Sequence, residues 1–329
     1  MKRLGFYEEG FLVAPLLPLP VLTAPDISGG GIGGGGGGEA GITWTLRPLM
    51  RFNSFLDDVV YGNGLFVAVG GSGTIFTSPD GVDWTQRTSE GNDLFGVTYG
   101  NGLFVAVDDL FFGVTCREGL FVAVGLGGAI LTSPDGVDWT EQTSPTRNDL
   151  FGVTYGKGTF VAVGWRGTIL TSLDGVNWKR RTSGTSVVLS GVTYGNGRFV
   201  AVGKGGTILT SPDGVSWMRR TSPTRDWLNG VAYGNGTFVA VGDNGTILTS
   251  PDGVNWTRRT SPTFSLLVGV TYGNGTFVAV GWNGTILTSP DGVDWTQRTS
   301  GTSNNLSRVA YGNGTFVAVG WHGTILTSP

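Results

Sequence analysis

The sequence predicts an all-β protein, a β-propeller whose blades each contain four strands. Its 329 residues include 59 glycines, 11 tryptophans and 18 phenylalanines, with only 14% charged residues, which is typical of many tight turns around an aromatic core. Tyrosines and tryptophans each recur every 39 residues, at Tyr155, Tyr194, Tyr233, Tyr272 and Tyr311 and at Trp139, Trp178, Trp217, Trp256 and Trp295. A period of about 40 residues made only of strands and turns is typical of propeller blades.

Each repeat divides into four strands, as in residues 269–300, GVTYGNGTFVAVGWNGTILTSPDGVDWTQRTS. Strand A is GVTY, and the Asn-Gly pair after it favours a two-residue hairpin because both positions tolerate positive φ. Strand B is TFVAVG, strand C is GTILTS after a short glycine turn, and strand D is VDWTQRT after the S-P-D-G corner. β-Branched and aromatic residues fill these strands, so we expect largely buried sheets.

The corners count the blades. Six complete corners begin at Ser78, Ser133, Ser172, Ser211, Ser250 and Ser289, and a seventh begins at Ser328. The GITWT run at 41–45 matches GVDWT at 81–85, so we expect this early strand to complete the last blade. Pairing the two ends removes two open sheet edges, which would otherwise favour aggregation. The sequence therefore predicts seven blades, closed by pairing the N-terminal strand with the C-terminal blade.

One hairpin does not fit this count. Residues 95–107 form an A–B hairpin without a C–D pair, and a second A–B hairpin follows at 112–125. We favour a seven-bladed ring from which the extra hairpin bulges. The alternative is a stunted eighth blade.

The corner S-P-D-G-V-D-W resembles the Asp-box of sialidase-like and other BNR-type propellers, although glycine here directly follows the aspartate and shortens the corner by one residue. The longer unit FVAVGxxGTILTSPDGVxWT is similar to repeats of phage tail, tail-fibre and bacterial surface proteins. This resemblance covers nearly all of 41–329 and implies a propeller in a virion (phage tail) or extracellular location, or alternatively on a bacterial surface. An aspartate at such a corner fixes the turn by accepting backbone hydrogen bonds, so we assign a structural role to Asp80, Asp135, Asp174, Asp213, Asp252 and Asp291.

Composition narrows the possible functions. A net charge of −3 disfavours nucleic acid as a partner, and the single histidine, His322, excludes a multi-histidine metal site. We expect no cofactor, and the single cysteine excludes an internal disulfide. A sialidase-like glycoside hydrolase, the enzymatic alternative, needs an asymmetric set of arginines, a Tyr–Glu pair and an acid, and no such set stands out. Arginine pairs on the outer strands, at 180–181, 219–220 and 258–259, are expected to protect sheet edges, with ligand binding as the alternative.

Sequence variation indicates one face as the binding surface. The A–B hairpins and C–D corners hardly vary between repeats. The B–C turns and D–A loops do differ between repeats, and we call the face that carries them the variable face. Aromatic side chains in turns and loops suit stacking on sugar rings, or they cap the ends of the blades; these candidates are Trp165, Trp227, Trp282 and Trp321. Polar residues that precede strand A are expected to line the channel mouth, at Asp57, Asp58, Asn229, Ser307 and Arg308. We therefore predict a non-catalytic recognition or structural module, with a cell-surface polysaccharide as the hypothetical ligand.

The first 40 residues lie outside the repeat. Residues 1–28 are apolar and proline-rich, and residues 29–40 form a glycine-rich linker. Prolines interrupt the apolar stretch, so we expect no membrane insertion. We expect an extended anchoring segment that joins the propeller to other virion or tail proteins, with a disordered tail or a secretory signal as alternatives. A bacterial assembly or surface protein that binds another protein is a further alternative for the whole chain.

Overall fold

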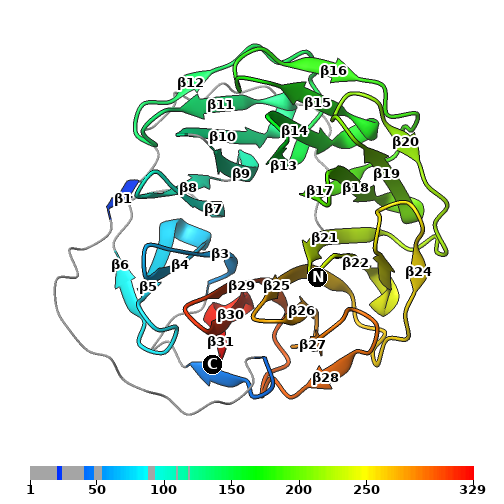
Figure 1. Cartoon of the computed structure of the whole chain (residues 1–329). Helices are drawn as coiled ribbons and strands as arrows, with labels where there is room; N and C mark the ends of the chain where they lie inside the picture. Colours follow the sequence, from blue (N-terminus) through cyan, green and yellow to red (C-terminus); the bar gives the residue numbers. More distant parts are fainter. Residues whose placement is uncertain (1–20, 24–40, 48–53, 88–92, 109, 118) are drawn as a thin grey trace.

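The computed structural model describes residues 21–23, 41–47, 54–87, 93–108, 110–117 and 119–329. These residues form seven four-stranded antiparallel sheets and one three-stranded sheet, arranged as blades around a ring (Figure 1). The prediction of an all-β propeller with seven four-stranded blades is confirmed. Helix is confined to single 3-10 turns in the described part of the chain, and none of these has the length of a membrane-spanning helix.

The two inner strands of each sheet are long. The innermost, or A, strands are β3 (Leu56–Gly62), β7 (Leu94–Gly100), β9 (Phe111–Arg117), β13 (Leu150–Gly156), β17 (Leu189–Gly195), β21 (Leu228–Gly234), β25 (Leu267–Gly273) and β29 (Leu306–Gly312). The B strands are β4 (Leu65–Gly70), β8 (Leu103–Asp108), β10 (Leu120–Gly125), β14 (Thr159–Gly164), β18 (Arg198–Gly203), β22 (Thr237–Gly242), β26 (Thr276–Gly281) and β30 (Thr315–Gly320).

The outer strands are shorter. The C strands are β5 (Thr74–Ser78), β11 (Ile130–Ser133), β15 (Ile169–Ser172), β19 (Thr207–Ser211), β23 (Ile247–Ser250), β27 (Ile286–Ser289) and β31 (Thr324–Ser328). The D strands have only two or three residues and are β2 (Thr45–Arg47), β6 (Thr85–Arg87), β12 (Thr140–Glu141), β16 (Lys179–Arg181), β20 (Met218–Arg219), β24 (Thr257–Arg258) and β28 (Thr296–Arg298). The 3-10 turns join B to C strands and are η1 (Gly71–Gly73), η2 (Leu126–Gly128), η3 (Trp165–Gly167), η4 (Lys204–Gly206), η5 (Asp243–Gly245) and η6 (Trp321–Gly323).

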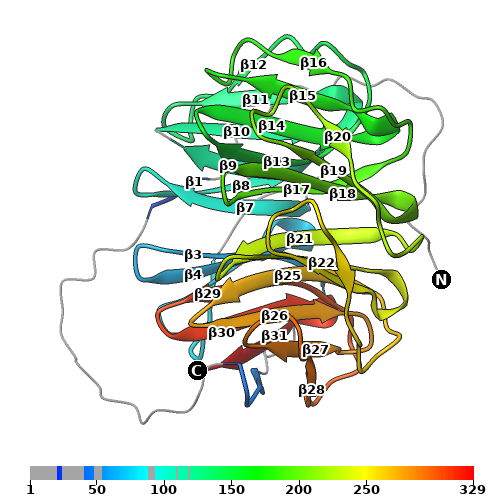
Figure 2. The ribbon, with the colours of Figure 1, turned by 45° about the vertical axis from the view of Figure 1, so that its right-hand side comes forward.

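The extra hairpin, β7–β8, takes a place of its own in the ring. Strand β7 packs against β3 on one side and β9 on the other, as the innermost strands of neighbouring blades do elsewhere. A third strand, β1 (Val21–Thr23), pairs antiparallel with β8, with Val21 opposite Val105 (Figure 2). The hairpin therefore forms an eighth, smaller sheet within the ring, beside the seven four-stranded blades. The favoured bulge is wrong, and the alternative, a stunted eighth blade, is what the structure shows.

The ring closes as the sequence predicts. Strand β2 pairs with β31, with Thr45 opposite Thr327, and so becomes the fourth strand of the last blade. The backbone N–H of Gly41 donates to the Ser328 hydroxyl at 2.9 Å, as corner glycines do in other blades. Closure by the early strand is confirmed.

The core lies between blades. The B strands alternate, so that valines face one neighbouring blade while phenylalanine and alanine face the other. Val200 and Val202 of β18 pack against Phe238 and Ala240 of β22, for example, and all four are fully buried. The same arrangement recurs in the other complete blades. Each blade thus buries its apolar surface only by stacking on the next.

Each corner is held by a small hydrogen-bond network. Asp252 Oδ1 accepts the Ser250 hydroxyl and the backbone N–H groups of Val254 and Asn255, at 2.8 to 2.9 Å. The Trp256 indole N–H donates to the carbonyl of Gly253 at 2.9 Å. Equivalent carboxylate bonds hold the other five corners, at Asp80, Asp135, Asp174, Asp213 and Asp291. The backbone N–H and side-chain amide of Asn177 lower the pKa of Asp174 well below its usual range. The structural assignment of these aspartates therefore agrees with their contacts.

The segments assigned as an anchor, 1–28, and a linker, 29–40, lie outside the described residues except for β1. That strand belongs to the eighth sheet, so part of the proposed anchor contributes to the ring itself. The anchoring role stays a prediction.

Removing the closing strand should open the ring. Deletion of residues 41–47 leaves the edge of β31 without a partner, so we expect a marked fall in melting temperature and the appearance of aggregates. Differential scanning fluorimetry and size-exclusion chromatography measure both. A deletion variant as stable and monomeric as the parent would contradict the closure.

Corner residues should matter for stability. Trp256 is 9% exposed, so Trp256→Ala should lower the free energy of unfolding by about 3–5 kcal/mol, and Asp252→Ala by about 1–2 kcal/mol through lost backbone hydrogen bonds. Chemical denaturation measures both changes, with the exposed neighbour Thr257→Ala as a control expected within about 0.5 kcal/mol of the parent. Unchanged stability together with lost ligand binding would instead place a binding site at the corners.

Candidate functional site

The B–C turns and D–A loops lie together, as expected for the variable face. The Trp165 backbone N–H, at the start of turn η3, donates to the carbonyl of Asp149 in the loop before β13, at 2.8 Å. On the other face, the Asn196 side chain in an A–B hairpin donates to the Pro251 carbonyl in the corner of the next blade, at 3.2 Å. The division of turns between two faces is confirmed.

The four candidate tryptophans differ in exposure. Trp282 and Trp321 are 45% and 39% exposed, and the ring of Trp321 meets Phe55 edge to face at 5.3 Å. Trp165 and Trp227 are half-buried. Two tryptophans are thus presented to solvent on this face, whereas the other two are partly covered.

Trp227 shows how such a ring covers a neighbour. Its indole N–H donates to the Ser190 hydroxyl of the preceding blade at 2.6 Å. The Lys204 ammonium lies 5.5 Å from the centre of the same indole ring system, on a turn of that preceding blade. Trp227 therefore joins two blades and keeps a cation against its ring.

A ring of side chains surrounds the axis on the variable face. It consists of the second residue of each innermost strand, and we call it the inner ring: Asp57, Phe95, Phe112, Phe151, Ser190, Asn229, Val268 and Ser307. Three consecutive members are aromatic, with ring centres 6.4 Å apart for Phe95 and Phe112 and 5.5 Å apart for Phe112 and Phe151. The sequence signal of this aromatic arc is Phe-Gly at the same point of three repeats, but none of the three phenylalanines is among the predicted site residues.

The predicted polar residues occupy the rest of the inner ring or lie next to it. The Asn229 side chain donates to Asp243 Oδ1 at 3.0 Å and to the Leu267 carbonyl at 3.1 Å. Arg308 is exposed, and its guanidinium donates to the carbonyl of Ser307 at 3.1 Å. These three polar residues therefore approach the ring axis from two strands, β21 and β29.

The Asp58 carboxylate accepts hydrogen bonds from the backbone of two strands. It occupies the third position of β3, where six of the eight innermost strands carry glycine and β29 carries Arg308. Its carboxylate accepts the backbone N–H of Val97 in β7 at 3.0 Å and that of Val59 at 2.9 Å. Asp58 therefore bridges two innermost strands, and Asp57 beside it is the carboxylate that belongs to the inner ring.

Electrostatics make Asp57 unusual. Desolvation raises the pKa of Asp57 to about 6, while the cation of Arg308 opposes this rise and the nearby Asp58 and Asp93 add to it. Desolvation also raises the pKa of Asp58, against Arg308 and the two backbone hydrogen bonds. An inner ring with an aromatic arc and a sector of carboxylate, amide and guanidinium groups can hold a ligand that has one apolar and one hydrogen-bonding side.

The raised pKa of Asp57 predicts a pH-dependent stability. The unfolded carboxyl ionises near 3.8 and the folded one near 6, so stability falls as pH rises through this interval. Asp57→Asn removes this loss and should raise the free energy of unfolding at pH 7 by about 1–2 kcal/mol, a value reduced because water near the inner ring screens part of the effect. At pH 4 the variant and the parent should differ little in stability. Thermal denaturation between pH 4 and 7.5 measures it, with Asp83→Asn on the opposite face as the control. A variant less stable than the parent at pH 7 would contradict the prediction.

Comparison with known proteins supports the fold. No family model matches the sequence, and no curated protein matches it. Among solved structures, YCF48 bound to D1 peptide has 19% identity and a TM-score of 0.61, covering 87% of this chain and 96% of that one. A computationally designed protein, Ika8, has 11% identity and a TM-score of 0.73, and the match covers 88% of this chain and 99% of that one. A catalytically inactive virginiamycin B lyase from Staphylococcus aureus with quinupristin has 14% identity and a TM-score of 0.68, and the match covers 87% of this chain and 99% of that one. At these identities the likeness shows a shared propeller fold.

Proposed function

We propose that this protein is a non-catalytic recognition module that binds its ligand on the variable face. The observation that carries the proposal is the exposure of Trp282 and Trp321 in turns whose neighbouring strands are almost invariant between repeats. Exposed aromatic rings in a patch are typical of binding surfaces, because their apolar area is otherwise left in water. Turnover of fluorogenic glycosides, including sialosides, would contradict the non-catalytic assignment.

The ligand that best suits these rings is a glycan on a host cell surface. A tryptophan face stacks on the apolar side of a sugar, and the asparagines beside Trp282 and in the loop before β29 can bond its hydroxyls. We propose a location in a virion, as a phage tail component that is joined to other tail proteins through residues 1–40. The likeness of the repeat unit to those of phage tail proteins supports this setting. Several weak sites on one disc would bind a repetitive surface by avidity.

A protein or peptide partner is the second candidate. The observation that favours it is the aromatic arc of Phe95, Phe112 and Phe151, which offers apolar surface at the ring axis. One structural neighbour, YCF48, is described in complex with a D1 peptide. Under this alternative the chain is a bacterial assembly or surface protein, and substitution of the arc should weaken binding more than substitution of the tryptophans.

Removing the tryptophans should weaken glycan binding. Each stacked ring contributes on the order of 1 kcal/mol, so single Trp→Ala variants should lose about fivefold in affinity, and the triple variant of Trp165, Trp282 and Trp321 far more. A glycan array and whole-cell binding measure this, after circular dichroism shows that the variant folds. The matched control replaces three exposed apolar residues of the opposite face, Val137, Leu173 and Val215, by alanine. Parent-like binding by the triple tryptophan variant would contradict the glycan proposal.

A further inference from the structure

A groove at the rim of one blade gathers three arginines. It has a volume of about 580 Å³ and lies between turn η4, strand β20 and the loop that leads to β21. Arg219, Arg220 and Arg225 line it together with Gly206, Ser222 and Thr224, and no carboxylate is among its lining residues. Three arginines along one open groove, with no carboxylate in its lining, form a positive site.

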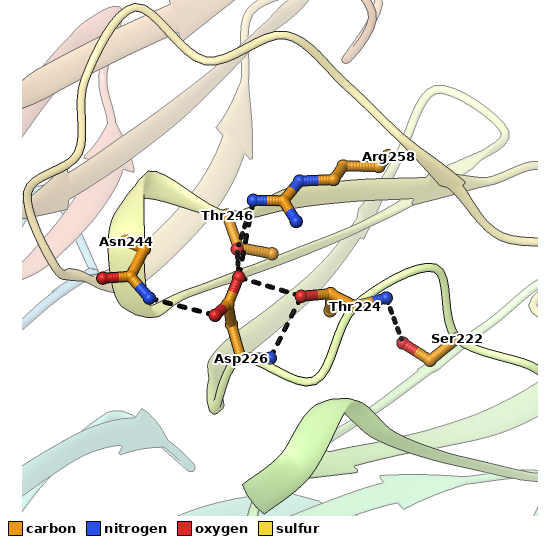
Figure 3. A network of polar contacts seen from close by, with 6 residues as sticks. All are labelled: Ser222, Thr224, Asp226, Asn244, Thr246 and Arg258. Carbon is orange, nitrogen blue, oxygen red and sulfur yellow. Dashed lines mark hydrogen bonds and ion pairs between the residues drawn. The ribbon is translucent and has the colours of Figure 1, made fainter.

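The next blade holds the same groove with less charge, because two arginines line it, Arg258 and Arg259, and the first is paired with a carboxylate. There the lining includes Arg258, which stands 39 residues after Arg219, and Phe264, which stands in the place of Arg225. The Arg258 guanidinium lies 3.4 Å from Asp226 Oδ2, and Asp226 is held by Thr246 at 2.6 Å and Asn244 at 3.0 Å (Figure 3). In the first groove the residue equivalent to Asp226 is Val187. The internal repeat thus provides a partly neutralised counterpart beside a groove whose lining has three arginines and no carboxylate.

The two arginines of each pair have different roles. The second, such as Arg220, bonds the Thr210 hydroxyl of the neighbouring C strand through its Nε at 2.7 Å, and the same bond recurs in six of the seven four-stranded blades. The first lies opposite a leucine or phenylalanine of that C strand and varies between blades. It is arginine only in three consecutive blades, at Arg180, Arg219 and Arg258, and is leucine, glutamine or glutamate elsewhere. Arg258 is already paired with Asp226, whereas Arg219 has Val187 in the place of that carboxylate and is available for a ligand.

Cations concentrate on this sector although the chain has a net charge of −3. Lys179 precedes Arg180 on β16, and Lys204 lies in turn η4, whose next two residues line the groove. Like charges gathered in this way repel one another unless an anion neutralises them. Lys204 also lies against the ring of Trp227, whose indole N–H donates to Ser190 of the inner ring.

We propose that this groove binds the acid groups of an anionic polysaccharide, carboxylate or sulfate. Arginine pairs bidentately with such planar or tetrahedral anions, and the hydroxyls of Ser222 and Thr224 offer further donors. This inference rests on the proposed glycan-binding function and names the charge class of the ligand.

The test uses the full chain and labelled polymers. Polygalacturonate supplies carboxylates, dextran sulfate supplies sulfates, and neutral dextran is the reference. We expect the parent to bind an acidic polymer but not neutral dextran, and the double variant Arg219→Gln, Arg225→Gln to bind at least tenfold more weakly by fluorescence anisotropy. The control is the double variant Arg147→Gln, Arg258→Gln, which removes two charges from equivalent positions around other grooves. Its affinity for the acidic polymer should fall less than threefold. Val187→Asp, which adds a carboxylate opposite Arg219, should also weaken binding.

Several results would overturn the proposal. These are an absence of parent binding to either acidic polymer, parent-like binding by the arginine double variant, equal losses in the control, or tighter binding of polyglutamate, which would indicate an acidic protein partner. The triple tryptophan variant separates the two proposals in the same assay. If it binds acidic polymer like the parent while the arginine variant does not, the groove stands and the tryptophan site is wrong.

Discussion

The contact of each corner with the preceding blade is the constraint on which the ring depends. Gly253 has a φ of +73°, and a Cβ added there would lie 3.1 Å from a Val200 methyl of the previous blade. The residue must therefore be small and left-handed, and the carboxylate of Asp252 and the indole of Trp256 hold it there. The same few atoms turn the chain between strands and set the distance between blades. Invariance of the corners follows from this double role.

The sequence predicts most of this architecture because each local signal is repeated. The Asn-Gly hairpins have the expected positive φ, 46° at Asn63 and 75° at Gly64, and the closing strand pairs as expected. The D strands are shorter than predicted, since Trp256 belongs to the corner and β24 begins only at Thr257. Strand β1 could not be predicted, because it lies in a proline-rich segment and depends on an edge of β8 that no C strand covers.

The candidate site was less predictable, because it depends on contacts between repeats. Tryptophans in turns were visible in the sequence, but their exposure depends on the neighbouring loop, as the bond from Trp227 to Ser190 shows. Phe112 has the pattern of an ordinary strand residue, and only the packing of β9 between β7 and β13 places it among other aromatics. The charge of a rim groove likewise depends on residues more than 30 positions apart, Asp226 and Arg258. Sequence reasoning finds repeated features more readily than the differences between repeats.

Closure by an early strand also imposes an order in time. Gly41 and Ser328, which join the two sides of the last blade, are 287 residues apart. At about 5–20 residues per second, a ribosome makes the second partner roughly 15–60 seconds after the first. Until then β2 has no C strand of its own blade to join. Every other D strand follows its C strand within one corner, so the last blade is the one whose C and D strands are made far apart in time.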